Sequence, residues 1–306
     1  MPNAATIASR IHQQYNRPLS LNGLMRSLGN YSGIGVNMVR KFAVIMSLGI
    51  AMLTGAAPAS AADLGEQATN PIANLMSLRL QYQNSPSVYN ADSSQQAGIF
   101  QAVVPFELSS KTFPMLVTRW TTPYVQTPDL GPGIGKKDGL GDTSGLAFLV
   151  KPVAPGHTIA FGTSMTIPTA GDNEFTGAGQ WQLGPSAVYL NTKTPKLQWG
   201  LLAFQNWDVA SSRSDAEDVS ILSLQPILTK HFSGGWYVGA PDLPQTYDFE
   251  KNAWTLNLGA QVGRVFPLGK QPVQVFGAVY YNSEEDNELV SGEWTIKANI
   301  SFLLPK

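Results

Sequence analysis

Three basic residues, Arg79, Arg119 and Lys297, lie in segments in which apolar and polar residues alternate. By this parity each points to the polar side of its segment, because successive side chains of a strand face opposite ways. If the polar side encloses water, three cations on one wall would raise the local concentration of anions, including carboxylated aromatics. The alternative is that these cations pair with Glu107, Asp208 or loop carboxylates and only satisfy buried charge.

Residues suited to enzyme chemistry are scarce. A nucleophile needs a base within hydrogen-bond reach. Of the three histidines, His12 belongs to an N-terminal leader, and His157 and His231 fall in short turns. Paired carboxylates in the loops are solvated, or bind divalent cations that bridge to lipopolysaccharide. We therefore expect no enzyme activity, no cofactor and no catalytic metal.

The glycine-rich stretch GLGDTSG at 139–145 could suggest a phosphate-binding loop. It lacks the lysine that such a loop needs before its Ser or Thr, and it opens a strand instead of a helix. We interpret the stretch as a turn in which Asp142 bonds its own backbone.

The alternation that positions the three cations is clearest near the carboxyl end. Trp294, Ile296, Ala298, Ile300 and Phe302 share one face, and the intervening residues are Thr, Lys, Asn and Ser. Twelve such segments are predicted, at 75–84, 97–107, 113–125, 143–151, 157–168, 180–191, 196–208, 218–230, 235–242, 252–265, 271–282 and 292–304. The sequence therefore predicts an all-β fold, an antiparallel up-and-down transmembrane β-barrel of about 12 strands.

The connections between these segments sort by length and by charge. Those after the second, fourth, sixth, eighth and tenth segments are short and carry lysines, whereas the others, including DLPQTYDFEKN at 242–252, are longer and acidic. Short periplasmic turns and long outer loops are the pattern of outer-membrane barrels.

Aromatic residues predict two belts at the lipid–water boundaries of a bilayer. The outer ends of the segments carry Tyr124, Trp181, Trp207, Trp254, Tyr281 and Trp294, and the inner ends carry Phe106, Trp236, Phe266 and Phe302. The apolar faces are thus expected to meet lipid, and the small and polar faces are expected to line a lumen.

Prolines interrupt several segments. Pro114, Pro185 and Pro226 each remove a ladder donor, and a closed barrel has no edge strand to hide the loss. We expect bulges or breaks there, most of all at Pro226. The ninth segment, with Pro241 and Pro244, is the least secure.

The start of the chain indicates export. Residues 38–61 combine basic residues, an apolar stretch and a small-residue cleavage site, which predicts a signal peptide cleaved after Ala61. Residues 1–37 precede the basic start of that signal and are interpreted as an upstream extension of the gene, with Met38 the true initiator. Residues 62–74 would be a periplasmic leader or a small plug, of which we favour the leader, and 75–306 would form the barrel.

Composition excludes several classes of protein. The chain has 306 residues, no cysteine and 20 basic residues, five of which precede the cleavage site. The remaining 15 face 21 acidic residues, a net charge of about 6 negative, which does not suit nucleic-acid binding.

Six motifs carry a resemblance to a known family: ATNPIANLMSLRLQYQN at 68–84, GLGDTSG at 139–145, IPTAGD at 167–172, GAGQWQLGPSAV at 177–188, LQPIL at 224–228 and ISFLLPK at 300–306. They resemble the bacterial outer-membrane β-barrel family named for transport in the phenol meta-cleavage pathway, some members of which carry the misleading label neuromedin U. The similarity covers 68–306. The chain departs from outer-membrane barrels in general by continuing beyond Phe302.

The resemblance implies a porin-like channel in the outer membrane of a Gram-negative cell, for passive uptake of small aromatic or other hydrophobic compounds. The lipid bilayer, lipopolysaccharide and the outer-membrane assembly machinery would be its partners, with the solute unknown. The alternative is a structural or surface-interaction barrel that conducts nothing.

Overall fold

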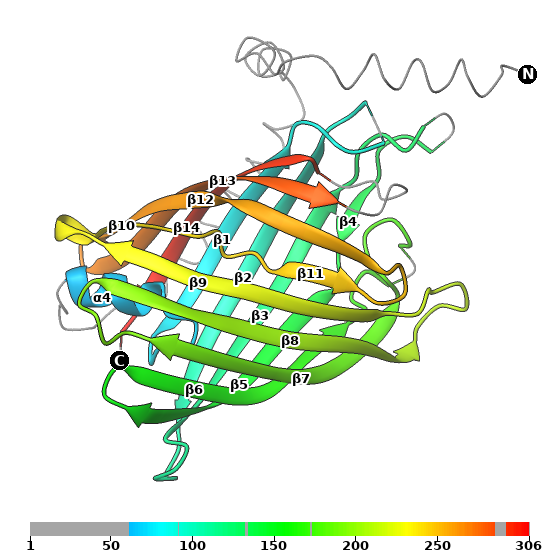
Figure 1. Cartoon of the computed structure of the whole chain (residues 1–306). Helices are drawn as coiled ribbons and strands as arrows, with labels where there is room; N and C mark the ends of the chain where they lie inside the picture. Colours follow the sequence, from blue (N-terminus) through cyan, green and yellow to red (C-terminus); the bar gives the residue numbers. More distant parts are fainter. Residues whose placement is uncertain (1–60, 91, 132–133, 172, 285–291, 306) are drawn as a thin grey trace, which may run out of the picture. The chain divides into compact units, whose positions relative to one another are not determined.

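The described part of the chain is a closed β-barrel. The computed structural model describes residues 61–90, 92–131, 134–171, 173–284 and 292–305 (Figure 1). Neighbouring strands pair antiparallel throughout, and the first strand pairs with the last. The predicted fold class is therefore confirmed. The expectations for 1–37 and for the signal peptide at 38–61 lie outside the described residues, apart from Ala61.

The strands are β1 (Met76–Ser85), β2 (Gln95–Glu107), β3 (Met115–Gln126), β4 (Asp138–Leu140), β5 (Thr143–Ala154), β6 (His157–Ile167), β7 (Gln180–Asn191), β8 (Leu197–Ser211), β9 (Ser220–His231), β10 (Trp236–Gly239), β11 (Gln245–Asp248), β12 (Ala253–Leu268), β13 (Gln271–Glu284) and β14 (Trp294–Leu304). A 3-10 turn, η2 (Ser233–Gly235), precedes β10. The fourteen strands make twelve crossings, because β4 and β5 both pair with β3, and β10 and β11 both lie between β9 and β12. The twelve predicted segments correspond to these crossings.

The two faces of the strands differ as the alternation predicts. In β14 the buried positions are Thr295, Lys297, Asn299, Ser301 and Leu303, and the residues between them are more exposed. All ten predicted belt aromatics lie at positions of the outward face, with Trp181, Trp207, Trp236 and Phe106 between 45% and 48% exposed. In a closed sheet the backbone N–H and C=O groups bond to one another. The apolar outer surface of the barrel can therefore face lipid without leaving backbone groups unsatisfied.

The inward face is not small and polar throughout, which corrects the sequence expectation. A buried apolar cluster lies on the inward face, made of Ile72, Val117, Leu146, Phe148, Val150, Ala160, Val188, Leu190, Leu202 and Ile227. Most of these come from the strands β3 to β9. The strand pattern in this half of the barrel is apolar on both faces, so alternation alone understates how much of the interior is apolar.

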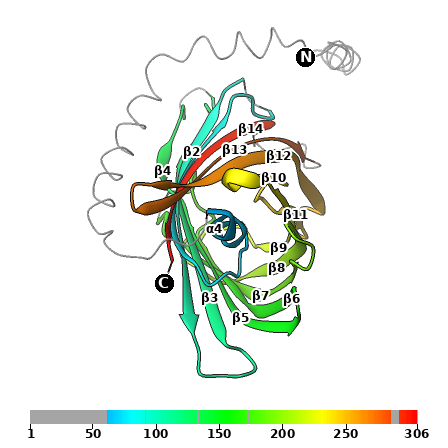
Figure 2. The ribbon, with the colours of Figure 1, turned by 90° about the vertical axis from the view of Figure 1, so that its left-hand side faces the viewer.

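Residues 61–75 enter the end of the barrel that carries the short turns. The helix α4 (Ala61–Ala68) lies inside the ring of strands (Figure 2). The Gln198 side-chain Nε2 donates to the Glu66 carbonyl oxygen at 2.7 Å, and the Thr69 hydroxyl lies 2.9 Å from Gln198 Oε1 and 3.1 Å from His231 Nε2. The stretch 62–74, for which a leader or a plug was considered, thus contacts the inner wall.

The ninth crossing is broken, as its prolines predict. Gly239 pairs with Thr229 of β9, and Gln245 pairs with Leu224 of β9. The chain advances six residues from Gly239 to Gln245, whereas β9 advances only five between their partners. Residues 240–244 therefore contain one residue more than the ladder accommodates. All five line the lumen cavity described below.

The prolines mark where this break occurs. Pro241 and Pro244 have no N–H to donate, and both lie in the surplus segment. Pro226 of β9 keeps its register with Leu201 of β8, and on its other side it faces the broken crossing. The break expected at Pro226 is therefore wrong for β9, and the irregularity lies in the neighbouring crossing, at residues 240–244.

The other two prolines are accommodated locally. Pro114 lies just outside β3. At Gly184 and Pro185 the pairing of β7 with β8 is interrupted. A Cβ placed on Gly184 would lie 1.8 Å from the Gln205 carbonyl oxygen, so the strands approach too closely for any side chain at this position.

Two expectations about the loops are wrong. The connection at 242–252 is short, because residues 245–248 pair as β11 and only 249–252 form the turn. Asp142 does not bond its own backbone turn. Its two carboxylate oxygens accept hydrogen bonds from the backbone N–H groups of Ala170 (3.1 Å) and Ala178 (2.7 Å), which belong to the next loop.

Replacing Asp142 with Ala should therefore loosen the loop between β6 and β7. Two charge-assisted bonds to backbone donors would be lost, each contributing on the order of 1.5–3 kcal/mol. We expect faster cleavage between residues 168 and 179 in limited proteolysis of the folded protein. Asp129→Ala is the matched control, since Asp129 accepts from Gly131 within its own turn. Equal cleavage of the two variants would contradict the assignment.

Candidate solute-binding site in the lumen

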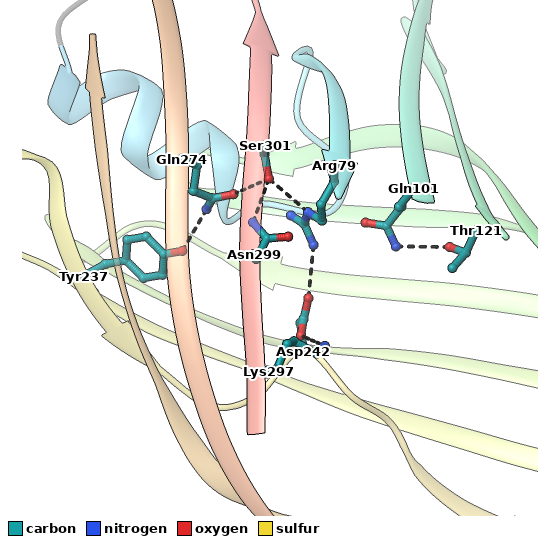
Figure 3. A network of polar contacts seen from close by, with 9 residues as sticks. All are labelled: Arg79, Gln101, Thr121, Tyr237, Asp242, Gln274, Lys297, Asn299 and Ser301. Atoms are coloured by element: carbon teal, nitrogen blue, oxygen red, sulfur yellow. Dashed lines mark hydrogen bonds and ion pairs between the residues drawn. The ribbon is translucent and has the colours of Figure 1, made fainter. Parts of the chain in front are cut away.

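Asp242 brings two of the predicted cations together. Its Oδ2 lies 3.0 Å from Arg79 Nη1 and its Oδ1 lies 2.7 Å from Lys297 Nζ (Figure 3). The side chains of Asp242, Arg79 and Lys297 are 22%, 14% and 2% exposed. The Asp242 carboxylate thus contacts each cation through one oxygen and neutralises one of their two positive charges.

Neutral polar groups hold Arg79 in place. Its Nε donates to Ser301 Oγ at 3.2 Å, and its guanidinium carbon lies 5.7 Å from the centre of the Phe276 ring. Ser301 Oγ also lies 3.2 Å from Gln274 Oε1, and Gln274 Nε2 donates to the Tyr237 hydroxyl at 2.9 Å. Figure 3 shows how the side chains of Arg79 (β1), Tyr237 (β10), Gln274 (β13) and Ser301 (β14) meet. The network restricts the rotamers of Arg79 and so fixes its direction.

Arg119 differs from the other two cations. It lies on β3, where its neighbours across the ladder are Val103 of β2 and Leu146 of β5. Its side chain lines the cavity, and among the described residues it forms no ion pair or hydrogen bond. Arg119 therefore presents a guanidinium whose donors are available to a ligand or to water.

These residues surround a lumen cavity of about 340 Å³. Its charged lining residues are Arg79, Arg119, Lys297 and Asp242, which gives a formal charge of two positive. Neutral polar lining groups include Gln101 and Thr121, which bond each other at 3.1 Å (Figure 3). Apolar lining residues include Ile99, Val103, Phe204, Ile227, Leu243 and Phe276.

All three predicted cations line one cavity, and two of them pair with a carboxylate of a predicted loop, which was one of the alternatives considered. Of the alternatives considered, Glu107 accepts a hydrogen bond from Asn74, and Asp208 accepts one from the Val219 backbone. Asp242, assigned to an outer loop, is the partner. A detectable signal was present, because an acidic residue between two prolines occupies a register position of the ninth strand.

Each of the two described histidines lies within hydrogen-bond distance of a hydroxyl group. His157 Nδ1 lies 2.9 Å from the Tyr189 hydroxyl, and His231 contacts Thr69 at the wall of the barrel. Within the described ranges, no three acidic or histidine side chains are grouped closely enough to hold a metal ion. In the same part of the chain, helices reach neither the length nor the apolarity that a membrane-crossing helix requires.

Comparisons with solved structures identify the same architecture. No family model and no curated protein matches the sequence. An outer membrane channel from Pseudomonas putida superimposes with a TM-score of 0.59 at 16% identity, covering 76% of this chain and 96% of that one. At this identity the likeness shows the fold, a barrel of the outer-membrane type.

Weaker similarities follow. The KdgM porin gives a TM-score of 0.43 at 9% identity, covering 74% of this chain and 98% of the porin. Outer membrane phospholipase A from Escherichia coli gives a TM-score of 0.42 at 11% identity, covering 80% of this chain and 98% of the phospholipase.

Proposed function

We propose that this protein is an outer-membrane channel that lets small solutes pass by diffusion. The observation that carries the proposal is the lumen cavity, whose cationic and polar lining lies inside a barrel with an apolar outer face. Outer-membrane barrels combine a lipid-facing apolar band with a polar interior. The two aromatic belts would lie at the membrane interfaces, and the signal peptide would deliver the chain to the periplasm.

The finer proposal is that the solutes are small aromatic or other hydrophobic compounds. It draws on the motif resemblance to the phenol meta-cleavage transport family and on the apolar cluster beside the cavity. An apolar lining favours such compounds because burying their surface contributes about 25 cal/mol per Å².

Single-channel recording tests the proposal. The protein lacking residues 1–61, refolded and inserted in planar bilayers, should show discrete conductance steps with a preference for anions, because the cavity lining is positive. Folding of the preparation is checked by heat-modifiable migration in gels. If folded protein shows no conductance, the protein is not a channel.

A non-conducting barrel is the second candidate, and the position of α4 favours it. A helix within the ring of strands reduces the space for solutes. Removing residues 62–70 separates the two candidates. A channel obstructed by this segment should gain conductance on its removal, whereas a barrel filled by its own side chains should remain silent.

A further inference from the structure

We propose that Arg119 binds the carboxylate of a small organic acid whose apolar body occupies the lumen cavity. This inference rests on the proposed function and specifies the solute, an aromatic monocarboxylate of about one ring.

The first argument is the difference between Arg119 and its neighbours. Arg79 and Lys297 already share the carboxylate of Asp242, at 3.0 Å and 2.7 Å. Arg119 lines the same cavity and, in the described part of the chain, forms no ion pair or hydrogen bond, so the charge of Asp242 acts on it only from a longer distance. The donors of the Arg119 guanidinium are thus free for a ligand, and a guanidinium pairs with a carboxylate through two parallel hydrogen bonds.

The second argument is that this wall already holds one carboxylate. Asp242 reaches the lumen from the surplus segment 240–244 and leaves the lining with two net positive charges. A monoanion placed on Arg119 would reduce that charge without displacing Asp242. The cavity therefore favours one carboxylate on the entering solute, and a second would find no free arginine or lysine in the described lining.

The third argument concerns the body of the ligand. Val103, across the ladder from Arg119, lines the cavity together with Ile99, Phe204 and Phe276. These apolar groups suit a ring or a short alkyl chain. The volume of about 340 Å³ is near the lower end of ligand pockets, which span roughly 300–1,000 Å³. This size suits a single ring.

Isothermal titration calorimetry on the detergent-solubilised protein tests the site with benzoate as the probe. Benzyl alcohol, of similar shape and without charge, is the ligand control. We expect benzoate to bind at least tenfold more tightly than benzyl alcohol. Equal affinities, or no benzoate binding at millimolar concentrations, would overturn the site without the use of any variant.

Substitutions then locate the contact. Arg119→Gln should weaken benzoate binding at least tenfold and leave benzyl alcohol binding unchanged, and Arg119→Lys should recover part of the loss. Lys270→Gln removes a cation from the exposed turn between β12 and β13 and should change nothing. Benzoate affinity retained in Arg119→Gln would refute the assignment.

Conductance of the same preparation separates the two proposals. Protein that conducts ions but does not bind benzoate would remove this site and leave the channel. Protein that binds benzoate through Arg119 without conducting would remove the channel and leave the site.

Discussion

Replacing Asp242 with Ala should destabilise the barrel by about 3–5 kcal/mol, because it leaves a buried cation uncompensated. The main cause is Lys297, whose side chain is 2% exposed and whose Nζ lies 2.7 Å from Asp242. The free energy of unfolding can be measured in lipid vesicles by denaturant titration with tryptophan fluorescence.

A matched control exists on the surface. Asp215 pairs with Arg213 at 3.2 Å, but its side chain is 61% exposed. Asp215→Ala should cost less than about 1 kcal/mol, as exposed ion pairs do. The double variant Asp242→Ala with Lys297→Met should recover most of the loss, because it removes the unpaired charge. Equal losses for Asp242→Ala and Asp215→Ala would show that burial does not strengthen the lumen pair.

Replacing both Arg79 and Lys297 with Ser should shift ion selectivity from anions toward cations. The formal charge of the cavity lining falls from two positive to zero, and Asp242 is left without its partners. Focused fields in a narrow lumen change local ion concentrations by about tenfold or more. The reversal potential of single channels in a salt gradient measures the change.

The control for this prediction is a charge loss outside the lumen. Lys230 and Lys270 are both exposed, and replacing both with Ser removes two cations without altering the cavity lining. Selectivity should then remain that of the unaltered protein. If the Arg79 and Lys297 variant also keeps its selectivity, these two cations serve structure alone.

The strands could be predicted because their causes are local. A two-residue period, as in Trp294 to Phe302, follows from burying one face of a strand, and the turns between strands have their own residue preferences. The boundaries of β7 at Gln180–Asn191 are those the sequence predicts. Parity also placed Arg79, Arg119 and Lys297 on the lumen side.

The failures involve contacts between segments far apart in the chain. Asp242 meets Lys297 from the segment 240–244, which holds one residue more than the β9 ladder accommodates, and neither propensity nor period encodes this contact. Asp142 lies in a sequence typical of a local turn, yet its acceptors are used by Ala170 and Ala178. The apolar interior around Phe148 was missed because an inward apolar residue does not break a strand pattern.

Asp242 connects the two ends of the barrel sequence. One oxygen contacts Arg79 of β1 and the other contacts Lys297 of β14, and these strands become neighbours only when the sheet rolls into a cylinder. The contact among Asp242, Arg79 and Lys297 must therefore form late in biogenesis, after β1 has paired with β14. Formation of the two ion pairs of Asp242 would therefore mark the final step of barrel closure during membrane insertion.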